Sequence, residues 1–141
     1  MPISGTLKKI DLNITNQCNL RCSHCVFNSG HRSENCSFAE IEKFLTDARS
    51  IGASRIDITG GEALTREDIF DIIALAKSLG YRIELLSNGI ALSDEVIKRL
   101  LSLKLDAVGI SLESLDYETN KKIRPTTKEQ FSDLCPELKT Q

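Results

Sequence analysis

The sequence predicts an α/β protein with one parallel sheet, and two observations support this prediction. Short strand-like runs alternate with longer segments whose apolar residues recur at helical spacing, and this unit occurs four times in 141 residues. A weak internal repeat marks the same units, because S-I-G at 50–52 and S-L-G at 78–80 each shortly precede a strand. Alternating strands and helices form parallel sheets joined by right-handed crossovers. The sequence shows no low-complexity segment or linker, so we predict a single domain over residues 1–141.

The four predicted strands are residues 7–15, 55–59, 82–87 and 107–112. In the first, apolar residues alternate with polar ones from Ile10 onward, which is the period of a strand. The other three are the short runs R-I-D-I-T, R-I-E-L-L-S and A-V-G-I-S-L. A polar or glycine-containing segment follows each predicted strand and marks the carboxyl end of that strand.

Four predicted helices follow the strands. The first begins at Ser37, where Glu40 completes a capping box, and it ends at Gly52. The others are expected to begin at Thr65 or Arg66, at the N-cap Ser93 and at the N-cap Thr127. Pro136 lies inside the apolar pattern of the last helix, which runs to Leu138, and should kink or shorten it.

Composition and charge argue against two classes of partner. Apolar residues make up 40% and charged residues 27% of the chain, as in ordinary soluble globular proteins. The formal net charge of −2 gives no basis for non-specific binding to nucleic acid or a membrane surface. No apolar run approaches the ~20 residues that span a bilayer, and the N-terminus lacks the apolar core of a signal peptide. We therefore expect a cytoplasmic protein.

Three cysteines, Cys18, Cys22 and Cys25, follow the first predicted strand with the spacing C-x-x-x-C-x-x-C. Two more, Cys36 and Cys135, lie outside this cluster. An odd number of cysteines, concentrated in one loop, indicates metal or redox chemistry rather than a disulfide framework.

The unusual residues of the sequence are predicted to meet at one edge of the sheet. In parallel α/β folds, ligands bind outside the carboxyl ends of the strands. Four segments follow these ends: residues 18–25, Gly60-Gly61-Glu62, Ser87-Asn88-Gly89 and Ser111-Leu112-Glu113. This convergence supports a functional site more strongly than any one segment does.

Three thiolates leave two kinds of metal site open. A structural zinc site needs four ligands, and His24, His31 or Cys36 could supply the fourth, although a second C-x-x-C is absent. A four-iron cluster takes one thiolate per iron, so three cysteines would leave one iron free to bind a substrate or cofactor. A chemically idle group of thiols is the third interpretation.

The run I-T-N-Q-C-N-L-R-C-S-H-C at 14–25 resembles the signature of the radical S-adenosylmethionine (radical SAM) superfamily, C-x-x-x-C-x-Φ-C, where Φ is usually aromatic. The later G-G-E, S-N-G and I-S-L-E segments are similar to family motifs at the ends of the second, third and fourth strands. The resemblance covers roughly residues 7–125. It implies part of a TIM-type barrel: the family core has six strand–helix units, and this sequence supplies four, so it is truncated relative to that core.

The resemblance implies that Cys18, Cys22 and Cys25 hold a 4Fe–4S cluster whose fourth iron chelates the amino and carboxylate groups of S-adenosylmethionine (SAM). A reduced cluster passes one electron to the sulfonium. Cleavage then gives methionine and a 5′-deoxyadenosyl radical, which abstracts hydrogen from a substrate. An external one-electron reductant is implied as a partner. The cluster and SAM carry this chemistry, so no side chain is assigned a catalytic role.

Other cofactor-binding residues follow from the same resemblance by position. His24, at the Φ position, would place a flat ring near the adenine. Gly60 and Gly61 would let the backbone approach the ligand closely. Backbone carbonyls there, together with Glu62, would accept hydrogen bonds from the SAM ammonium group.

The third and fourth strand ends would contribute further contacts. Ser87 and Asn88 would offer short polar groups to the ribose or the substrate, and Ser111 a polar contact to SAM. Glu113, where the family more often has aspartate, would reach a ribose hydroxyl. Each feature also has an ordinary explanation: a solvent-facing loop histidine, a Gly-Gly turn, an Asn-Gly turn or an inward strand-end serine.

Three residues are left without an assigned role. Arg124 could meet the SAM carboxylate, but a surface arginine is the preferred interpretation. Cys36 and Cys135 match no ligand position of the family. Cys135 lies on the apolar side of the last predicted helix and is expected in the core.

The leading hypothesis is a radical SAM enzyme, or its N-terminal portion, acting on an unidentified substrate. The sequence context is closest to the branch that modifies peptides and cofactor precursors. The alternative is a non-catalytic iron–sulfur or zinc-binding module, or a fragment that folds only with a partner. The fourth strand is expected to be an exposed edge of the sheet. A second chain that pairs with this edge and completes the barrel is therefore a further possible partner.

Overall fold

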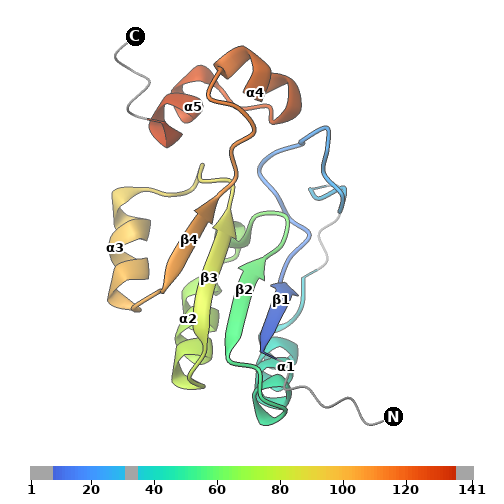
Figure 1. Cartoon of the computed structure of the whole chain (residues 1–141), viewed down its shortest axis with the longest axis vertical. Helices are drawn as coiled ribbons and strands as arrows, with labels where there is room; N and C mark the ends of the chain where they lie inside the picture. Colours follow the sequence, from blue (N-terminus) through green and yellow to red (C-terminus); the bar gives the residue numbers. More distant parts are fainter. Residues whose placement is uncertain (1–7, 31–34, 136–141) are drawn as a thin grey trace.

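A computed structural model describes residues 8–30 and 35–135, and it shows one sheet of four parallel strands in the order β1-β2-β3-β4 (Figure 1). The strands are β1 Lys9–Asn13, β2 Arg55–Thr59, β3 Arg82–Ser87 and β4 Ala107–Ile110. The helices are α1 Phe38–Ser50, α2 Ile69–Ser78, α3 Asp94–Ser102, α4 Tyr117–Ile123 and α5 Lys128–Leu134, with a 3₁₀ turn η1 at Ala63–Thr65. The predicted α/β class with successive parallel strands is confirmed.

One face of the sheet packs on helices and forms the core. Ile56 and Ile58 of β2 alternate with polar residues, so both point to this face and are fully buried. Ile41 and Leu45 of α1 pack into the same core cluster. Each such side chain contributes about 1.5–3 kcal/mol relative to exposure. The core therefore lies between the sheet and the amphipathic faces of α1 and α2.

The other face of the sheet is charged. The strand register places Lys9, Arg55 and Arg82 in one row. Two residues further along each strand, Asp11, Asp57 and Glu84 form a second row, with Asp57 nearly buried and ion-paired to Lys9. These charges explain why apolar and polar residues alternate along the strands. Parallel strands that are covered on both faces are instead continuously apolar in sequence.

Several predicted boundaries shift in the structure. Leu7 lies outside the described residues, and β1 and β4 end earlier than predicted. The second helix begins at Ile69 rather than at Thr65 or Arg66, because Arg66 has extended backbone dihedrals after η1. Helix α4, which the carboxylate of Asp116 caps, was not predicted from the sequence.

The last helix, α5, ends as the proline suggested. It stops at Leu134, two residues before Pro136, and Thr127 and Gln130 form the capping box at its start. Pro136 and Leu138 themselves lie outside the described residues. Figure 1 shows α4 and α5 beyond the carboxyl ends of the strands, on the side of the cysteine-containing loop.

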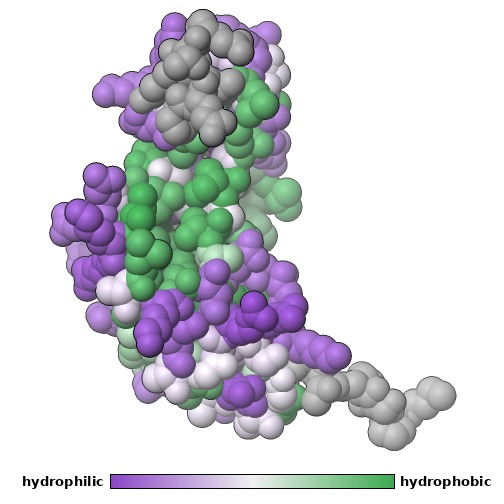
Figure 2. All heavy atoms as spheres, turned by 60° about the vertical axis from the view of Figure 1, so that its left-hand side comes forward, coloured by the Kyte–Doolittle hydropathy of each residue, from purple (hydrophilic) through white to green (hydrophobic). Residues whose placement is uncertain are grey.

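The edge strand β4 and helix α3 carry an exposed apolar surface. Ile97 and Leu101 of α3, with Val108 and Ile110 of β4, are 40–69% exposed. Figure 2 shows this surface facing the viewer as a continuous apolar area. It confirms the expected exposed edge at the fourth strand. None of the helices in the described part of the chain has the length and apolar character needed to cross a bilayer.

We expect this chain to self-associate through the apolar surface of α3 and β4, and we expect Leu101→Lys to reduce that association. Leu101 is 69% exposed within the apolar surface, so a charge there costs little in the monomer but opposes burial against another molecule. The apparent dissociation constant from sedimentation velocity should rise about tenfold. Ile51→Lys is the matched control, because Ile51 is 63% exposed at the end of α1, away from this surface. Equal effects of both substitutions would contradict the prediction.

Candidate functional site

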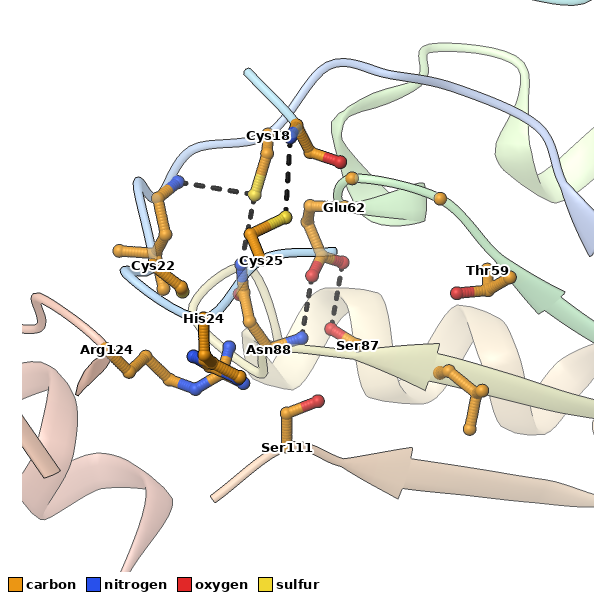
Figure 3. A pocket seen from close by; sticks show the side chains of 15 residues that line it. Cys18, Cys22, His24, Cys25, Thr59, Glu62, Ser87, Asn88, Ser111 and Arg124 are labelled. Carbon is orange, nitrogen blue, oxygen red and sulfur yellow. Dashed lines mark hydrogen bonds between the residues drawn. The ribbon is translucent and has the colours of Figure 1, made fainter. Parts of the chain in front are cut away.

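The cysteine loop (residues 16–30), which follows β1, and the ends of β2, β3 and β4 surround one pocket (Figure 3). Its wall contains Cys18, Cys22, His24, Cys25, Ser29, Gly60, Gly61, Glu62, Ser87, Asn88, Ser111 and Arg124, among others. The structure thus brings together every predicted site residue except Glu113, which contacts the wall residues His24 and Arg124. Convergence follows from the topology, because all four strands are parallel and end at the same edge.

Gly60 and Gly61 are required by the backbone of the cysteine loop. The N–H of Gly61 donates to the carbonyl of Thr15 at 2.7 Å, and the N–H of Glu62 donates to that of Gln17 at 2.8 Å. A Cβ on Gly60 would lie 2.6 Å from the Thr15 oxygen, and one on Gly61 only 2.2 Å from the Gln17 oxygen. The predicted close approach is therefore present, but the group approached is the protein's own loop.

Glu62 joins the ends of β2 and β3. It is 1% exposed, and its Oε1 accepts from the Leu64 N–H at 3.1 Å and the Ser87 hydroxyl at 2.9 Å. Its Oε2 accepts from the Asn88 N–H at 2.7 Å. A carboxylate has about four acceptor positions. With three bonds accepted, one position on Oε2 takes no hydrogen bond from the described residues.

Asn88 connects the end of β3 to the cysteine loop. Its Nδ2 donates to Asn19 Oδ1 at 2.7 Å and lies 4.0 Å from Cys18 Sγ. Its Oδ1 accepts from the N–H of Ile90. Asn88 and Ser87 are 5% and 3% exposed, so this segment is a buried part of the site rather than a plain surface turn.

The three clustered cysteines differ in their surroundings. Cys18 Sγ accepts from the N–H of Leu20 at 3.4 Å, and Cys25 Sγ from the N–H of Ser29 at 3.3 Å. Burial raises the pKa of the Cys22 thiol. Burial also raises the pKa of Cys25, but hydrogen bonding, chiefly from the backbone N–H of Ser29, outweighs it, and the net pKa lies below the ordinary value. The loop therefore favours the thiolate at Cys25 more than at Cys22.

Arg124 is a buried pocket residue, and the expectation of a surface arginine is wrong. It is 8% exposed, and its Nη2 donates to Glu113 Oε1 at 2.8 Å. The same carboxylate oxygen lies 3.2 Å from His24 Nε2. Glu113 thus contacts protein groups on both sides instead of facing the pocket. The arginine was misjudged because α4, which precedes it and carries it back over the strand ends, was not predicted.

Two buried polar atoms of the pocket wall lack partners. Among the described residues, Ser29 Oγ and Arg124 Nε are buried without a hydrogen-bond partner. Leaving a buried polar group unpaired costs about 1–3 kcal/mol. Both residues line the same pocket, so a polar ligand there would satisfy them. Ser29 had no signal in the sequence, because nothing local distinguishes it from other loop serines.

The radical SAM superfamily model matches residues 12–140. This chain belongs to the radical SAM superfamily. Among curated relatives, it is 30% identical over 113 residues to the AdoMet-dependent heme synthase of Methanosarcina barkeri, covering 79% of this chain and 32% of that one. It is 32% identical over 128 residues to the GTP 3′,8-cyclase of Aquifex aeolicus, covering 86% of this chain and 40% of that one.

Solved structures confirm the partial radical SAM barrel. Streptococcus suis SuiB bound to S-adenosylmethionine aligns with a TM-score of 0.77 at 20% identity, covering 92% of this chain and 31% of that one. BtrN in complex with AdoMet and 2-DOIA aligns with a TM-score of 0.64 at 13% identity, covering 92% and 56%. At these identities the likeness concerns the fold alone. This radical SAM chain spans 32–41% of the length of its curated relatives.

Three thiols in one loop suit the iron–sulfur cluster that the family implies, because a cluster takes one thiolate per iron. All five cysteines are free thiols. In the described part of the chain, no three cysteine, histidine or carboxylate side chains are arranged to hold a single ion. A zinc ion draws its ligands to about 2.0–2.3 Å from one point, whereas a cluster takes one thiolate per iron.

The other candidate zinc ligands give no support to a zinc site. Cys36 is exposed, and its Sγ lies 3.9 Å from the Asn13 carbonyl, outside the pocket wall. His31 lies outside the described residues. Cys135 follows α5 and is partly exposed, rather than in the core as predicted.

We expect Glu113→Gln to lower the free energy of unfolding at neutral pH. Hydrogen bonding to Arg124 holds the pKa of Glu113 below its ordinary 4.5. The stabilisation of the folded state by ionised Glu113 is therefore complete at pH values above the pKa of the unfolded state. It is lost as the pH falls through the lower pKa of the folded state. Urea unfolding at several pH values should show the two proteins converging below about pH 4.5. A stability difference that persists unchanged in acid would contradict this assignment.

Proposed function

We propose that this chain binds a 4Fe–4S cluster through Cys18, Cys22 and Cys25 and cleaves SAM reductively at that cluster. The observation that carries the proposal is one pocket that combines three free thiols with two buried, unpartnered polar atoms, Ser29 Oγ and Arg124 Nε. When bound, the cluster and SAM would supply the chemistry: one-electron reduction of the sulfonium, with methionine as the leaving group, and hydrogen abstraction from a substrate by the 5′-deoxyadenosyl fragment.

The residues of the chain bind and orient SAM in this proposal. Arg124 offers its free Nε to the SAM carboxylate, and Glu113 holds the guanidinium in place from behind. The open acceptor position on Glu62 Oε2 takes a hydrogen from the SAM ammonium, together with backbone carbonyls at Gly60 and Gly61. In this proposal the positive Arg124 faces the carboxylate of the methionyl group, and the negative Glu62 faces its ammonium group.

The remaining pocket residues form the walls for the nucleoside part. His24 lines the pocket as a flat ring for the adenine, while its Nε2 faces Glu113. Ser111 and the Ser87-Asn88 segment provide polar groups toward the ribose or the substrate. Because Ser87 and Asn88 also have protein partners, we propose that they mainly hold the pocket wall in shape.

The proposed substrate is a peptide or a cofactor precursor, and an external one-electron reductant is required. A peptide substrate is supported by the fold likeness to SuiB, which was solved bound to its precursor peptide SuiA, at a TM-score of 0.77 and 21% identity. Further barrel strands, from a second chain or a longer form of this one, would find a free edge at β4. A cytoplasmic location remains a prediction.

Anaerobic reconstitution tests the proposed function. The chain is incubated with iron and sulfide, reduced with dithionite and given SAM, and 5′-deoxyadenosine is measured. The proposal expects product that depends on all three cysteines. A cluster whose EPR spectrum does not change when SAM is added would favour the non-catalytic iron–sulfur module. One tightly bound zinc ion per chain, with no uptake of a cluster, would contradict the proposal.

Arg124→Gln should weaken SAM binding by about 10- to 100-fold, the range for losing a charge-assisted hydrogen bond. Calorimetric titration of the reconstituted protein with SAM measures this. Arg124→Lys keeps the charge but loses the Nε donor, so it should bind with intermediate affinity. Lys122→Gln, an exposed change in α4, is the control. Unchanged affinity in Arg124→Gln would remove Arg124 from the proposed site.

A further inference from the structure

Arg66 closes the neck of the cysteine loop. The neck consists of residues 14–15 and 35–36, where Thr15 and Asn35 form an antiparallel bridge. The Arg66 Nη1 donates to the carbonyl of Ile14 and to that of Cys36, both at 2.7 Å. These two carbonyls lie on opposite sides of the neck. One guanidinium nitrogen therefore joins the chain entering the loop to the chain leaving it.

Asp68 fixes the orientation of this guanidinium. The Arg66 Nε donates to Asp68 Oδ1 at 2.8 Å, and Nη2 donates to Oδ2 at 2.7 Å, which is a bidentate pair. The Arg66 side chain is only 6% exposed, whereas that of Asp68 is 34% exposed, so the guanidinium is buried while the carboxylate stays partly open to water. A planar group held along one edge points its two Nη1 hydrogens in two fixed directions, one for each carbonyl. The two carbonyls are thus held at a set separation.

The cysteine loop has little apolar burial with which to order itself. Leu20 is buried at 7% exposure, but Val26 and Phe27 are 92% and 62% exposed. Ordering each backbone residue costs about 1–2 kcal/mol in entropy, which the burial of one leucine does not offset. Polar contacts at the neck and at the Gly61-Glu62 segment must therefore supply much of the order of the loop.

We propose that Arg66 is a positioning residue for the thiol site: it fixes the cysteine loop by closing its neck, and through the loop it sets where the three cysteines lie. The part that concerns the cluster rests on the proposed function. The part that concerns the loop does not, because it can be measured on the protein without metal. Arg66 acts at the neck and touches none of the three thiols.

Arg49 provides a matched control. Its Nε donates to the carbonyl of Leu79 at 3.0 Å and its Nη1 to that of Ala53 at 2.8 Å, so it also joins two chain segments through carbonyls. These carbonyls precede β3 and β2, at the opposite end of the strands. Arg49→Ala should therefore destabilise the fold by a comparable mechanism without loosening the cysteine loop.

The first measurement is amide hydrogen exchange of the full chain without metal. In Arg66→Ala, the amides of Leu20, Ser29 and Gly30 should exchange about tenfold faster or more than in Arg49→Ala. Arg66→Lys should give an intermediate rate, because lysine keeps the charge without the bidentate fork. If Arg66→Ala does not fold, Arg66→Lys is used for the comparison with Arg49→Ala instead. Exchange in the Arg66 variants equal to that in Arg49→Ala overturns the proposal.

The second measurement uses the reconstituted protein. Iron release to a chelator should be several-fold faster in Arg66→Lys than in wild type or Arg49→Ala, and the EPR spectrum of the reduced cluster should change. A merely structural role would leave that spectrum unchanged in the folded fraction. If wild type takes up no cluster, the proposed function fails, and the exchange result alone still decides the role of Arg66.

Discussion

Replacing any one of Cys18, Cys22 or Cys25 by serine should abolish cluster assembly and, with it, cleavage of SAM. Each thiolate is expected to bind a different iron, so none can substitute for another. The hydroxyl of serine is a poor ligand for iron at neutral pH because it remains protonated. Iron and acid-labile sulfide per chain after anaerobic reconstitution should fall to the background of unfolded protein, and 5′-deoxyadenosine should be undetectable.

The two outlying cysteines provide the controls for this experiment. Cys36 is exposed and Cys135 follows the last helix, and neither lines the pocket. Cys36→Ser and Cys135→Ser should therefore retain wild-type iron content. If Cys36→Ser lost the metal while one of the three clustered cysteines proved dispensable, the assignment of ligands would have to be revised in favour of a site that includes Cys36.

Gly61→Ala should displace the cysteine loop and remove most of the cluster-binding capacity. The new Cβ would lie 2.2 Å from the Gln17 carbonyl oxygen and 2.7 Å from its carbon, both backbone atoms that cannot rotate away. Overpacking of this kind typically costs about 1–3 kcal/mol. Relief of the contact would also break the Glu62-to-Gln17 hydrogen bond, which holds the loop just before Cys18. Reduced iron content together with a modest loss in thermal stability is expected.

Gly80→Ala separates loop displacement from general strain. Gly80 has φ of +82°, so alanine is strained there, but a Cβ would meet no atom closer than 3.7 Å. It lies between α2 and β3, at the far end of the sheet from the cysteine loop. Gly80→Ala should lose stability yet bind iron normally. A Gly61→Ala protein with full iron content would show that the loop can relax without harm.

Local patterns explain why much of the architecture was predictable. The alternation of R-I-D-I-T and the capping box at Ser37 and Glu40 act over a few residues, and the structure contains both elements. Where local signals were weak, the prediction failed. The polar helix α4 carries no apolar stripe, and the stretch before α2 folds as a 3₁₀ turn held by Glu62, which no helix pattern indicates.

The amino-acid sequence by itself determined the parallel α/β order, the meeting of four motifs at one edge and the thiol spacing. These follow from strand period, chain order and residue type. Only the tertiary structure decided what each polar group contacts. The carbonyls bound by Arg66 come from residues 52 and 30 positions away in the chain. The partners of Glu62 at the end of β3 and just after it are 25 and 26 residues away. Such contacts arise when packed elements bring distant segments together, because a buried polar group must find a partner wherever the fold supplies one.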